Sequence, residues 1–224
     1  MSRRGKFITF EGLDGTGKST QLRKLAAVLR QAGHAVVETR EPGGTATGEK
    51  VRRILLDSKT SGLAPSAEMA LMFASRAQHI SEVIEPAMAA GKIVLCDRFT
   101  DSTEAYQGHG RKLGSKVVLD LHRLLCHGLQ PDLTVLLDSN PASSVGRARR
   151  RNLRRGKTVG HADENRFEQE TQAFFVRVRE GFRVIGRRES QRVALVDASG
   201  TPAQTHTKIV ELVWRRLKLV VSNF

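Results

Sequence analysis

The stretch GLDGTGKS, residues 12–19, decides the fold of this chain. It matches the pattern G-x-x-x-x-G-K-[ST] and lies between an expected strand, KFITFE at 6–11, and a helix expected at about 18–31. Glycines in such a loop let backbone N–H groups point inward at phosphate oxygens, and the following helix offers its positive N-terminus to the same anion. The stretch therefore predicts a site for a nucleoside triphosphate between a strand and a helix.

This loop contains the residues that we expect to hold ATP and its metal. Lys18 would neutralise the terminal phosphates, and the Ser19 hydroxyl is suited to hold Mg²⁺. GTPases, ATPases and small-molecule kinases share the motif, so it leaves the reaction open, although no NKxD-type guanine motif is visible. The residues expected to contact ATP are Gly12, Leu13, Asp14, Gly15, Thr16, Gly17, Lys18, Ser19 and Thr20.

Strand and helix patterns alternate along the rest of the chain. Continuous apolar runs such as KIVLC (92–96) and LTVLLD (133–138) are typical of strands covered on both faces. The alternation predicts an α/β fold in three layers, a parallel sheet wrapped by helices and joined by right-handed crossovers. Further strands are expected at 34–39 and 192–197, helices at about 47–57, 66–89, 115–127, from 141, 166–187 and 203–217, and irregular chain at 152–165.

Length and composition indicate one soluble globular domain spanning residues 1–224, with 39% hydrophobic and 27% charged residues. No apolar run approaches the roughly 18–20 residues that a membrane span needs. Cys96 and Cys126 form no CxxC motif, so we expect a reducing, cytoplasmic location. The net charge of +14 indicates polyanionic partners, and half of the excess lies in RARRRNLRRGK, residues 147–157.

A second motif, CDRFTDSTEAYQG at residues 96–108, follows a buried strand. It places Asp97 and Arg98 at the carboxyl end of that strand, where open parallel sheets bind ligands. Arg98 can bind a phosphate with two parallel hydrogen bonds. Asp97 can hold Mg²⁺ or a water bound to it, or it can orient a neighbouring arginine. The alternative for this pair is a salt bridge with no role in binding. Asp138 also ends a strand and is either a metal-binding carboxylate or a cap for the helix expected from Pro141.

The chain resembles bacterial thymidylate kinases with a P-loop that lacks arginine. The resemblance runs from about residue 6 to 198 and implies a single P-loop nucleoside monophosphate kinase domain, with a mobile lid inserted at about 147–166. It implies ATP- and Mg²⁺-dependent phosphorylation of dTMP to dTDP by a homodimer, with no nucleic-acid or membrane partner. The segments that carry it are FEGLDGTGKST, TREPGGTATGEKVRRILL, LMFASRAQH, CDRFTDSTEAYQG and PDLTVLLD.

The resemblance also implies how the acceptor nucleotide binds. Asp14 would reach the 3′-hydroxyl of dTMP, and Glu41, in Arg40-Glu41-Pro42, would position the acceptor phosphate beside Mg²⁺, with an unusual peptide bond possible before the proline. Arg52 and Arg98 would bind the phosphate of dTMP. At the other end, Arg76 would donate to a thymine carbonyl, Thr103 and Gln107 would complete the edge of the base, and Tyr106 would fill the space of a ribose 2′-hydroxyl.

Two positions depart from the family pattern. The aromatic expected to stack on thymine often lies four residues before the arginine; Met72 occupies that position here, and we expect Phe73 to stack instead, with Met72 as the alternative. Since the P-loop lacks arginine, the transition-state cation would come from Arg151, Arg154 or Arg155, with Arg154 and Arg155 as the named catalytic candidates. The motif that usually closes the lid begins here with Asn165 in place of an acid.

Other functions compatible with these residues are phosphorylation of another nucleoside monophosphate or of a deoxynucleoside. A nucleic-acid-dependent P-loop ATPase is a further alternative, suggested by the net charge of +14. It would show stimulation by DNA or RNA and binding that weakens steeply with salt. The basic excess is concentrated in one segment, and no basic groove rich in aromatics is visible, which favours the kinase.

Overall fold

The structure, a computed structural model, describes residues 4–60, 62–155 and 166–218, with side chains of helix α7 described up to Arg150. Within these ranges five parallel strands form one sheet in the order β2-β3-β1-β4-β5. This confirms the predicted parallel sheet. The strands are β1 (Phe7–Glu11), β2 (Val36–Arg40), β3 (Ile93–Asp97), β4 (Leu133–Asp138) and β5 (Val193–Asp197).

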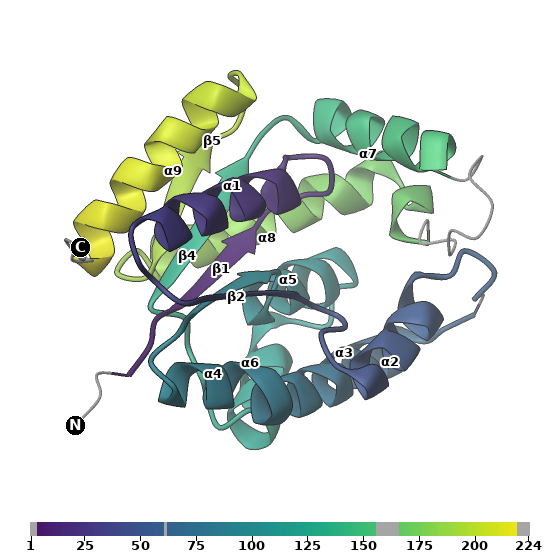
Figure 1. Cartoon of the computed structure of the whole chain (residues 1–224). Helices are drawn as coiled ribbons and strands as arrows, with labels where there is room; N and C mark the ends of the chain where they lie inside the picture. Colours follow the sequence, from purple (N-terminus) through teal and green to yellow (C-terminus); the bar gives the residue numbers. More distant parts are fainter. Residues whose placement is uncertain (1–3, 61, 156–165, 219–224) are drawn as a thin grey trace.

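Helices cover both faces of the sheet, which gives the expected three layers (Figure 1). On one face α1 (Lys18–Gln31) and α9 (Pro202–Leu217) pack side by side over an apolar core. On the other face, α3 (Pro65–His79) and α6 (Ser115–Leu125) pack over strands β1 and β3. Helix α8 (Gln172–Arg188) covers the β4–β5 side of that face.

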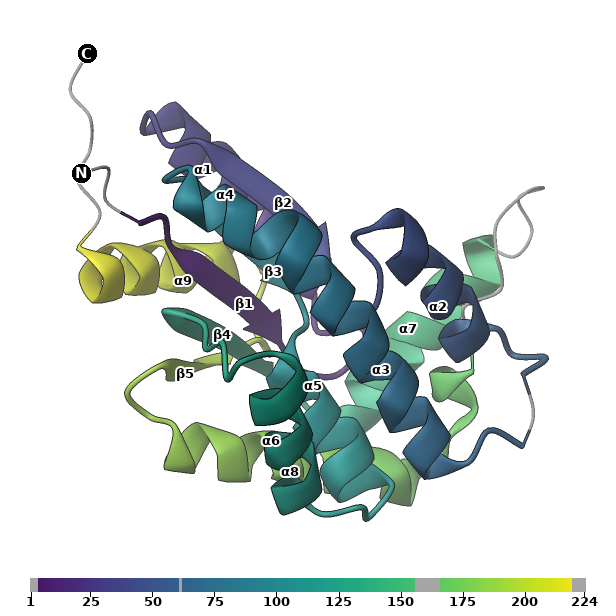
Figure 2. The same ribbon diagram turned by 90° about the horizontal axis from the view of Figure 1, so that it is seen from below.

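Figure 2 shows α2 (Ala46–Leu56) lying along α3 at the end of the molecule where α7 (Pro141–Arg155) also ends. The helical segment expected at 66–89 is continuous but changes type, since α3 passes through a π-helical turn at Ile80–Ile84 into α4 (Glu85–Ala89). Pro86 lies in the first turn of α4, directly after the π-helical turn, so this residue without a backbone N–H falls where the hydrogen-bonding pattern of the helix changes.

Two of the expected boundaries were wrong. Helix α8 begins at Gln172 rather than 166, because the chain forms a short 3₁₀ turn at Phe167–Gln169 and Thr171 then caps the helix with Oγ1 accepting from Phe174 N. Residues 152–155, expected to be irregular, complete α7. The remainder of that stretch, 156–165, lies outside the described residues.

The motif after β3 forms helical structure that the periodicity did not indicate. A short helix α5 (Thr100–Thr103) continues into a π-helix at Glu104–Gly110, and α8 packs against this segment. Because a π-helix shifts the side-chain spacing from about four residues to five, it gives no α-helical pattern to recognise. None of the helices in the described ranges is both long and apolar enough to cross a bilayer.

Candidate active site

The phosphate-binding loop joins β1 to α1, as expected. Gly12 and Gly15 have φ values of 128° and 80°, and a Cβ on either would lie within 2.3 Å of a backbone oxygen of Leu137 or Ser144. Only glycine fits this close approach, and it leaves the loop backbone open to a ligand. Lys18 is buried and donates from Nζ to the carbonyls of Gly12 and Leu13 at 3.1 and 3.0 Å; burial lowers its pKa.

Two side chains with oxygen atoms meet beside the loop: Ser19 lies at the start of α1, and Asp97 ends β3. The Ser19 hydroxyl donates to Asp97 Oδ2, and β1 pairs with β3 so that Phe10 is level with Asp97. A hydroxyl and a carboxylate are ligands that fit Mg²⁺, which takes its remaining ligands from water and phosphate. No group of three or more His, Cys, Asp or Glu side chains that could hold a metal ion occurs among the described residues.

Arg98 links the second motif to the phosphate-binding loop. Its backbone is left-handed, with φ of 75°, and its guanidinium donates from Nη2 to Asp14 Oδ1 at 2.8 Å and from Nη1 to Ser102 Oγ at 2.8 Å. The same Nη2 lies 3.2 Å from the Tyr106 hydroxyl, and the guanidinium carbon lies 5.0 Å from the centre of the Tyr106 ring. Arg98 is therefore held in one orientation by the phosphate-binding loop, by α5 and by the π-helix.

The segment that follows Arg98 is held from behind by a buried carboxylate. Glu11 accepts from Phe99 N at 2.7 Å and from Ser102 Oγ at 2.5 Å, and it is completely buried. Ser102 in turn accepts from Arg98, so Glu11 contributes to the position of the guanidinium. Burial, followed by the neighbouring charge of Asp101, raises the pKa of Glu11 from its ordinary value of 4.5 to about 8.

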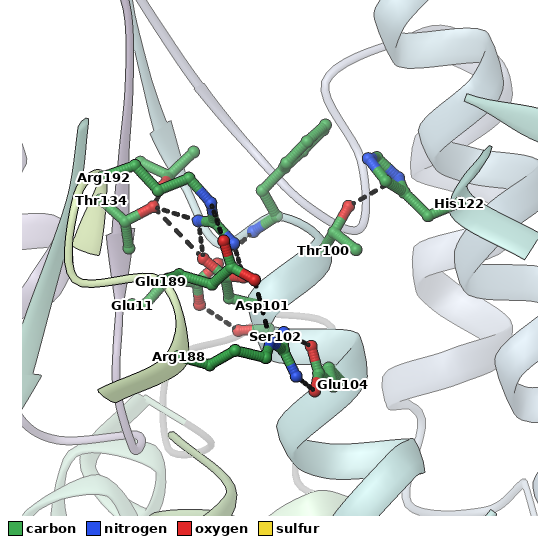
Figure 3. Close-up of polar contacts among 12 residues, drawn as sticks. Glu11, Thr100, Asp101, Ser102, Glu104, His122, Thr134, Arg188, Glu189 and Arg192 are labelled. Atoms are coloured by element: carbon green, nitrogen blue, oxygen red, sulfur yellow. Dashed lines mark hydrogen bonds and ion pairs between the residues drawn. The ribbon is translucent and has the colours of Figure 1, made fainter. Parts of the chain in front are cut away.

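Figure 3 shows two arginines that reach the same segment from the C-terminal end of α8 and the loop before β5. Arg192 donates two hydrogen bonds to the carboxylate of Asp101, at 2.7 and 2.8 Å. Arg188 donates two to the carboxylate of Glu104, also at 2.7 and 2.8 Å. Both carboxylates are buried, so these ion pairs prevent two unpaired charges behind the site. The position of the second motif thus depends on α8, which lies far from it in the sequence.

One cavity, of about 130 Å³, lies beside the phosphate-binding loop. It brings together all the predicted acceptor residues except Phe73, and residues 167 and 168 complete its wall. The lining residues are Asp14, Glu41, Pro42, Arg52, Leu56, Met72, Arg76, Arg98, Phe99, Ser102, Thr103, Tyr106, Gln107, Phe167 and Glu168.

Arg76 also lies in the wall of this cavity. It donates from Nε to Glu41 Oε2 at 2.7 Å and from Nη2 to Thr103 Oγ1 at 2.9 Å. Its guanidinium carbon lies 5.1 Å from the ring centres of both Phe73 and Phe99. Nη1 is buried and has no acceptor among the described residues. A buried donor of this kind is costly unless a ligand accepts from it, so Arg76 is a strong candidate for base recognition.

The structure corrects the expected stacking residue. Phe73 is fully buried beneath Arg76 and does not line the cavity, whereas Met72 does. The physical reason is the phase of α3: successive helical side chains differ by about 100° in direction, so position 72 faces the cavity and position 73 the core.

Glu41 lines the cavity with Arg76. Its two oxygens are engaged by Arg76 and by His79 Nδ1 at 3.0 Å, so it orients Arg76. Burial alone would raise the pKa of Glu41, but Arg76 and His79 outweigh it and the pKa is lowered. The Glu41–Pro42 peptide is cis, as the motif suggested, and Arg52 Nη1 donates to Pro42 O at 2.9 Å.

Of the basic run 147–157, Arg147 reaches the phosphate-binding loop, with Nε donating to Gly15 O at 2.8 Å. Arg147 was not among the predicted site residues, although its place in that basic run was a signal. The predicted catalytic candidates Arg151, Arg154 and Arg155 have side chains outside the described part of the chain, as does Asn165.

Asp138 does not cap α7. It is held by Arg179 at 2.7 and 3.0 Å and by Arg183 at 3.0 Å, both from α8. The cap of α7 is Asn140 instead, which accepts from Ala142 N at 2.9 Å.

A phosphate-binding loop at the carboxyl ends of the strands of a parallel sheet, with an arginine-lined cavity beside it, defines a nucleotide-dependent phosphotransferase. A model of the thymidylate kinase family matches residues 10–209. The thymidylate kinase of Trichlorobacter lovleyi is 49% identical over 215 residues, covering 96% of this chain and all of the relative, and that of Solidesulfovibrio magneticus is 48% identical over 208 residues, covering 93% and 96%. The crystal structure of thymidylate kinase from Ehrlichia chaffeensis superposes with a TM-score of 0.72 at 31% identity, covering 94% of this chain and 98% of that one. This chain belongs to the thymidylate kinase family.

Proposed function

We propose that this protein transfers the γ-phosphoryl group of ATP to the phosphate of dTMP, producing dTDP and ADP. Membership of the thymidylate kinase family supports the reaction. The observation that carries the proposal is a cavity lined by two arginines: Arg98 is held against Asp14 of the loop, and Arg76 has a buried Nη1 with no partner among the described residues. A phosphate with an attached base, held with the phosphate toward the loop, fits this distribution of donors.

The chemistry requires two polyanions to approach each other. The loop backbone and Lys18 would bind the ATP phosphates, and Arg52 and Arg98 would bind the acceptor phosphate and reduce the repulsion between them. Ser19 and Asp97 would hold Mg²⁺, which neutralises charge on the triphosphate. An oxygen of dTMP then bonds to the γ-phosphorus while the bond to the β-phosphate oxygen breaks, so that positioning and charge neutralisation contribute most of the catalysis.

At the base end, we assign Arg76 to a thymine carbonyl and Thr103 and Gln107 to the edge of the base. Met72 takes the place of Phe73 as the side chain facing the base, because it lines the cavity. Tyr106 is buried against Phe167, Phe174 and Phe182 in edge-to-face contacts, so its ring is rigid enough to occupy the space of a ribose 2′-hydroxyl.

The test is release of ADP from ATP and Mg²⁺ with dTMP as acceptor, and with dCMP, UMP, thymidine or no acceptor as controls. We expect strong turnover with dTMP and little with the others. If the enzyme prefers another monophosphate or thymidine, that compound and not dTMP is its acceptor substrate. Turnover that needs only DNA or RNA would instead support a nucleic-acid-dependent ATPase.

We also propose a homodimer that works in the cytoplasm. Helix α6 supports the dimer because Val117 and Leu124, which share one face at a spacing of seven, are 44% and 72% exposed. The buried free cysteines Cys96 and Cys126 suit a reducing compartment. Sedimentation of wild type and Leu124→Glu tests the dimer: a dimer converted to monomers supports this interface, and an unchanged dimer places it elsewhere.

The expected lid at 147–166 remains a prediction. Its C-terminal end supports a contact with the acceptor, because Phe167 and Glu168 line the cavity immediately after it.

A further inference from the structure

We propose that Glu68 sets the base selectivity of the acceptor site by holding the side-chain amide of Gln107 in one orientation. This inference rests on the proposed function. Glu68, on α3, is completely buried, and its Oε1 accepts from Gln107 Nε2 at 2.8 Å. Gln107 belongs to the π-helix and lines the cavity. Glu68 does not line the cavity and acts only through Gln107.

The chemistry of the two groups determines which end of the amide faces the cavity. A carboxylate only accepts hydrogen bonds, so the Gln107 NH₂ must face Glu68. No described residue donates to Gln107 Oε1, which leaves this oxygen for a ligand. A carbonyl oxygen at this point accepts from a base whose ring nitrogen carries a hydrogen. Thymine and uracil have that N–H at N3, and cytosine has a lone pair there instead.

The carboxylate is itself fixed by two arginines. Arg111 donates from Nε to Glu68 Oε1 at 3.2 Å and from Nη2 to Oε2 at 3.1 Å, and Arg166 Nη2 lies 2.7 Å from Oε2 as an ion pair. Arg111 also contacts Glu170 at 2.5 Å and lies 4.9 Å from the Phe174 ring centre. Glu68 is thus held in place by its neighbours, so the amide that it binds has one favourable orientation.

The test uses Glu68→Gln, which keeps the size of the side chain but lets it donate to Gln107 Oε1. The Gln107 amide can then turn and present its NH₂ to the base. We expect the ratio of kcat/KM for dTMP over dCMP to fall by about tenfold or more, the factor that one hydrogen bond is worth. The ratio for dTMP over dUMP should stay unchanged, because both bases present the same N3–H.

Removing a buried negative charge beside two arginines can prevent folding, so Glu68→Asp is the second variant. It keeps the charge but withdraws the carboxylate from Gln107, and the dTMP/dCMP ratio should fall there as well. Glu85→Gln, exposed on α4, is the matched control and should change neither ratio.

Three results would overturn the inference while leaving the proposed function intact. In the first, Glu68→Gln or the Asp variant is less active with both ratios unchanged, which is a structural effect alone. In the second, both ratios fall together, which is general loosening of the site. In the third, Glu68→Gln does not fold and the Asp variant keeps the wild-type dTMP/dCMP ratio. If the wild-type protein does not phosphorylate dTMP, the proposed function is wrong, and this inference, which rests on it, is wrong as well.

Discussion

Arg98 Nη2 donates to Asp14 Oδ1 at 2.8 Å, and this bond joins the end of β3 to the phosphate-binding loop after β1. Lys18 Nζ lies 3.6 Å from the same Asp14 oxygen. One carboxylate therefore lies between the cation assigned to ATP and the cation assigned to the acceptor. It sets their separation before either nucleotide binds, which is the kind of preorganisation that phosphoryl transfer needs.

Arg98→Lys tests this relationship. Lysine keeps the positive charge but cannot contact Asp14, Ser102 and a phosphate at once. We expect kcat/KM for dTMP to fall by about 10²–10³-fold, as for loss of a preorganised donor in other active sites. Arg215→Lys, exposed on α9, is the control. A fall of less than about threefold would show that charge alone suffices at position 98.

Tyr106 allows the ring and the hydroxyl to be tested separately. Tyr106→Phe removes the contacts of the hydroxyl with Arg98 and Asp14, at 3.2 and 3.4 Å, but keeps the ring. We expect kcat/KM for dTMP to fall about fivefold to tenfold, while the preference for dUMP over UMP is retained. Tyr106→Leu should reduce that preference as well. If the Phe variant loses it equally, the hydroxyl and not the ring rejects ribose.

The phosphate-binding loop and the order of strands and helices could be predicted because their signals are local. Glycine spacing, apolar runs and helix periodicity need no knowledge of distant contacts. Met72 and Phe73 could not be distinguished in this way. A shift of one residue in the expected phase of α3 exchanges a cavity position for a core position, and only the packing of this helix against Phe99 and the rest of the core determines which residue is buried.

The buried carboxylates were missed for a different reason. Glu68 is bound by Gln107 and Arg111, in and directly after the π-helix, and by Arg166. Both segments are far from Glu68 in the sequence, so no local spacing connects it to its partners. Glu11 did carry a signal, since it ends a buried strand and such a position demands a partner. Its partners, Phe99 N and Ser102, lie beyond the turn at Arg98, and that turn has a left-handed residue that the sequence does not indicate.

Asp138 provides a test of a structural role against a metal-binding role. Asp138→Asn loses the charge held by Arg179 and Arg183, and we expect the free energy of unfolding to fall by about 2 kcal/mol, as for hydrogen bonds to charged groups. Urea unfolding measures this. Turnover per folded molecule and its dependence on Mg²⁺ concentration should stay within about twofold of wild type. A strongly increased Mg²⁺ requirement would contradict this interpretation and assign the carboxylate to the metal.

Glu11 makes stability depend on pH in a direction opposite to that of most carboxylates. Its pKa rises on folding from 4.5 to about 8, so the folded state binds the proton more tightly than the unfolded chain does. The contribution of this group to stability is complete below pH 4.5 and is lost as the pH rises through 8. Glu11→Gln reproduces the protonated form, with its oxygen accepting from Phe99 N and its NH₂ donating to Ser102. We therefore expect the free energy of unfolding of wild type to fall more than that of Glu11→Gln between pH 5 and pH 9, measured by urea unfolding at each pH.

Glu211→Gln, exposed on α9, is the control and should follow wild type. Parallel curves for wild type and Glu11→Gln would mean that Glu11 is ionised throughout this range and that Arg98 compensates its charge more fully than burial opposes it.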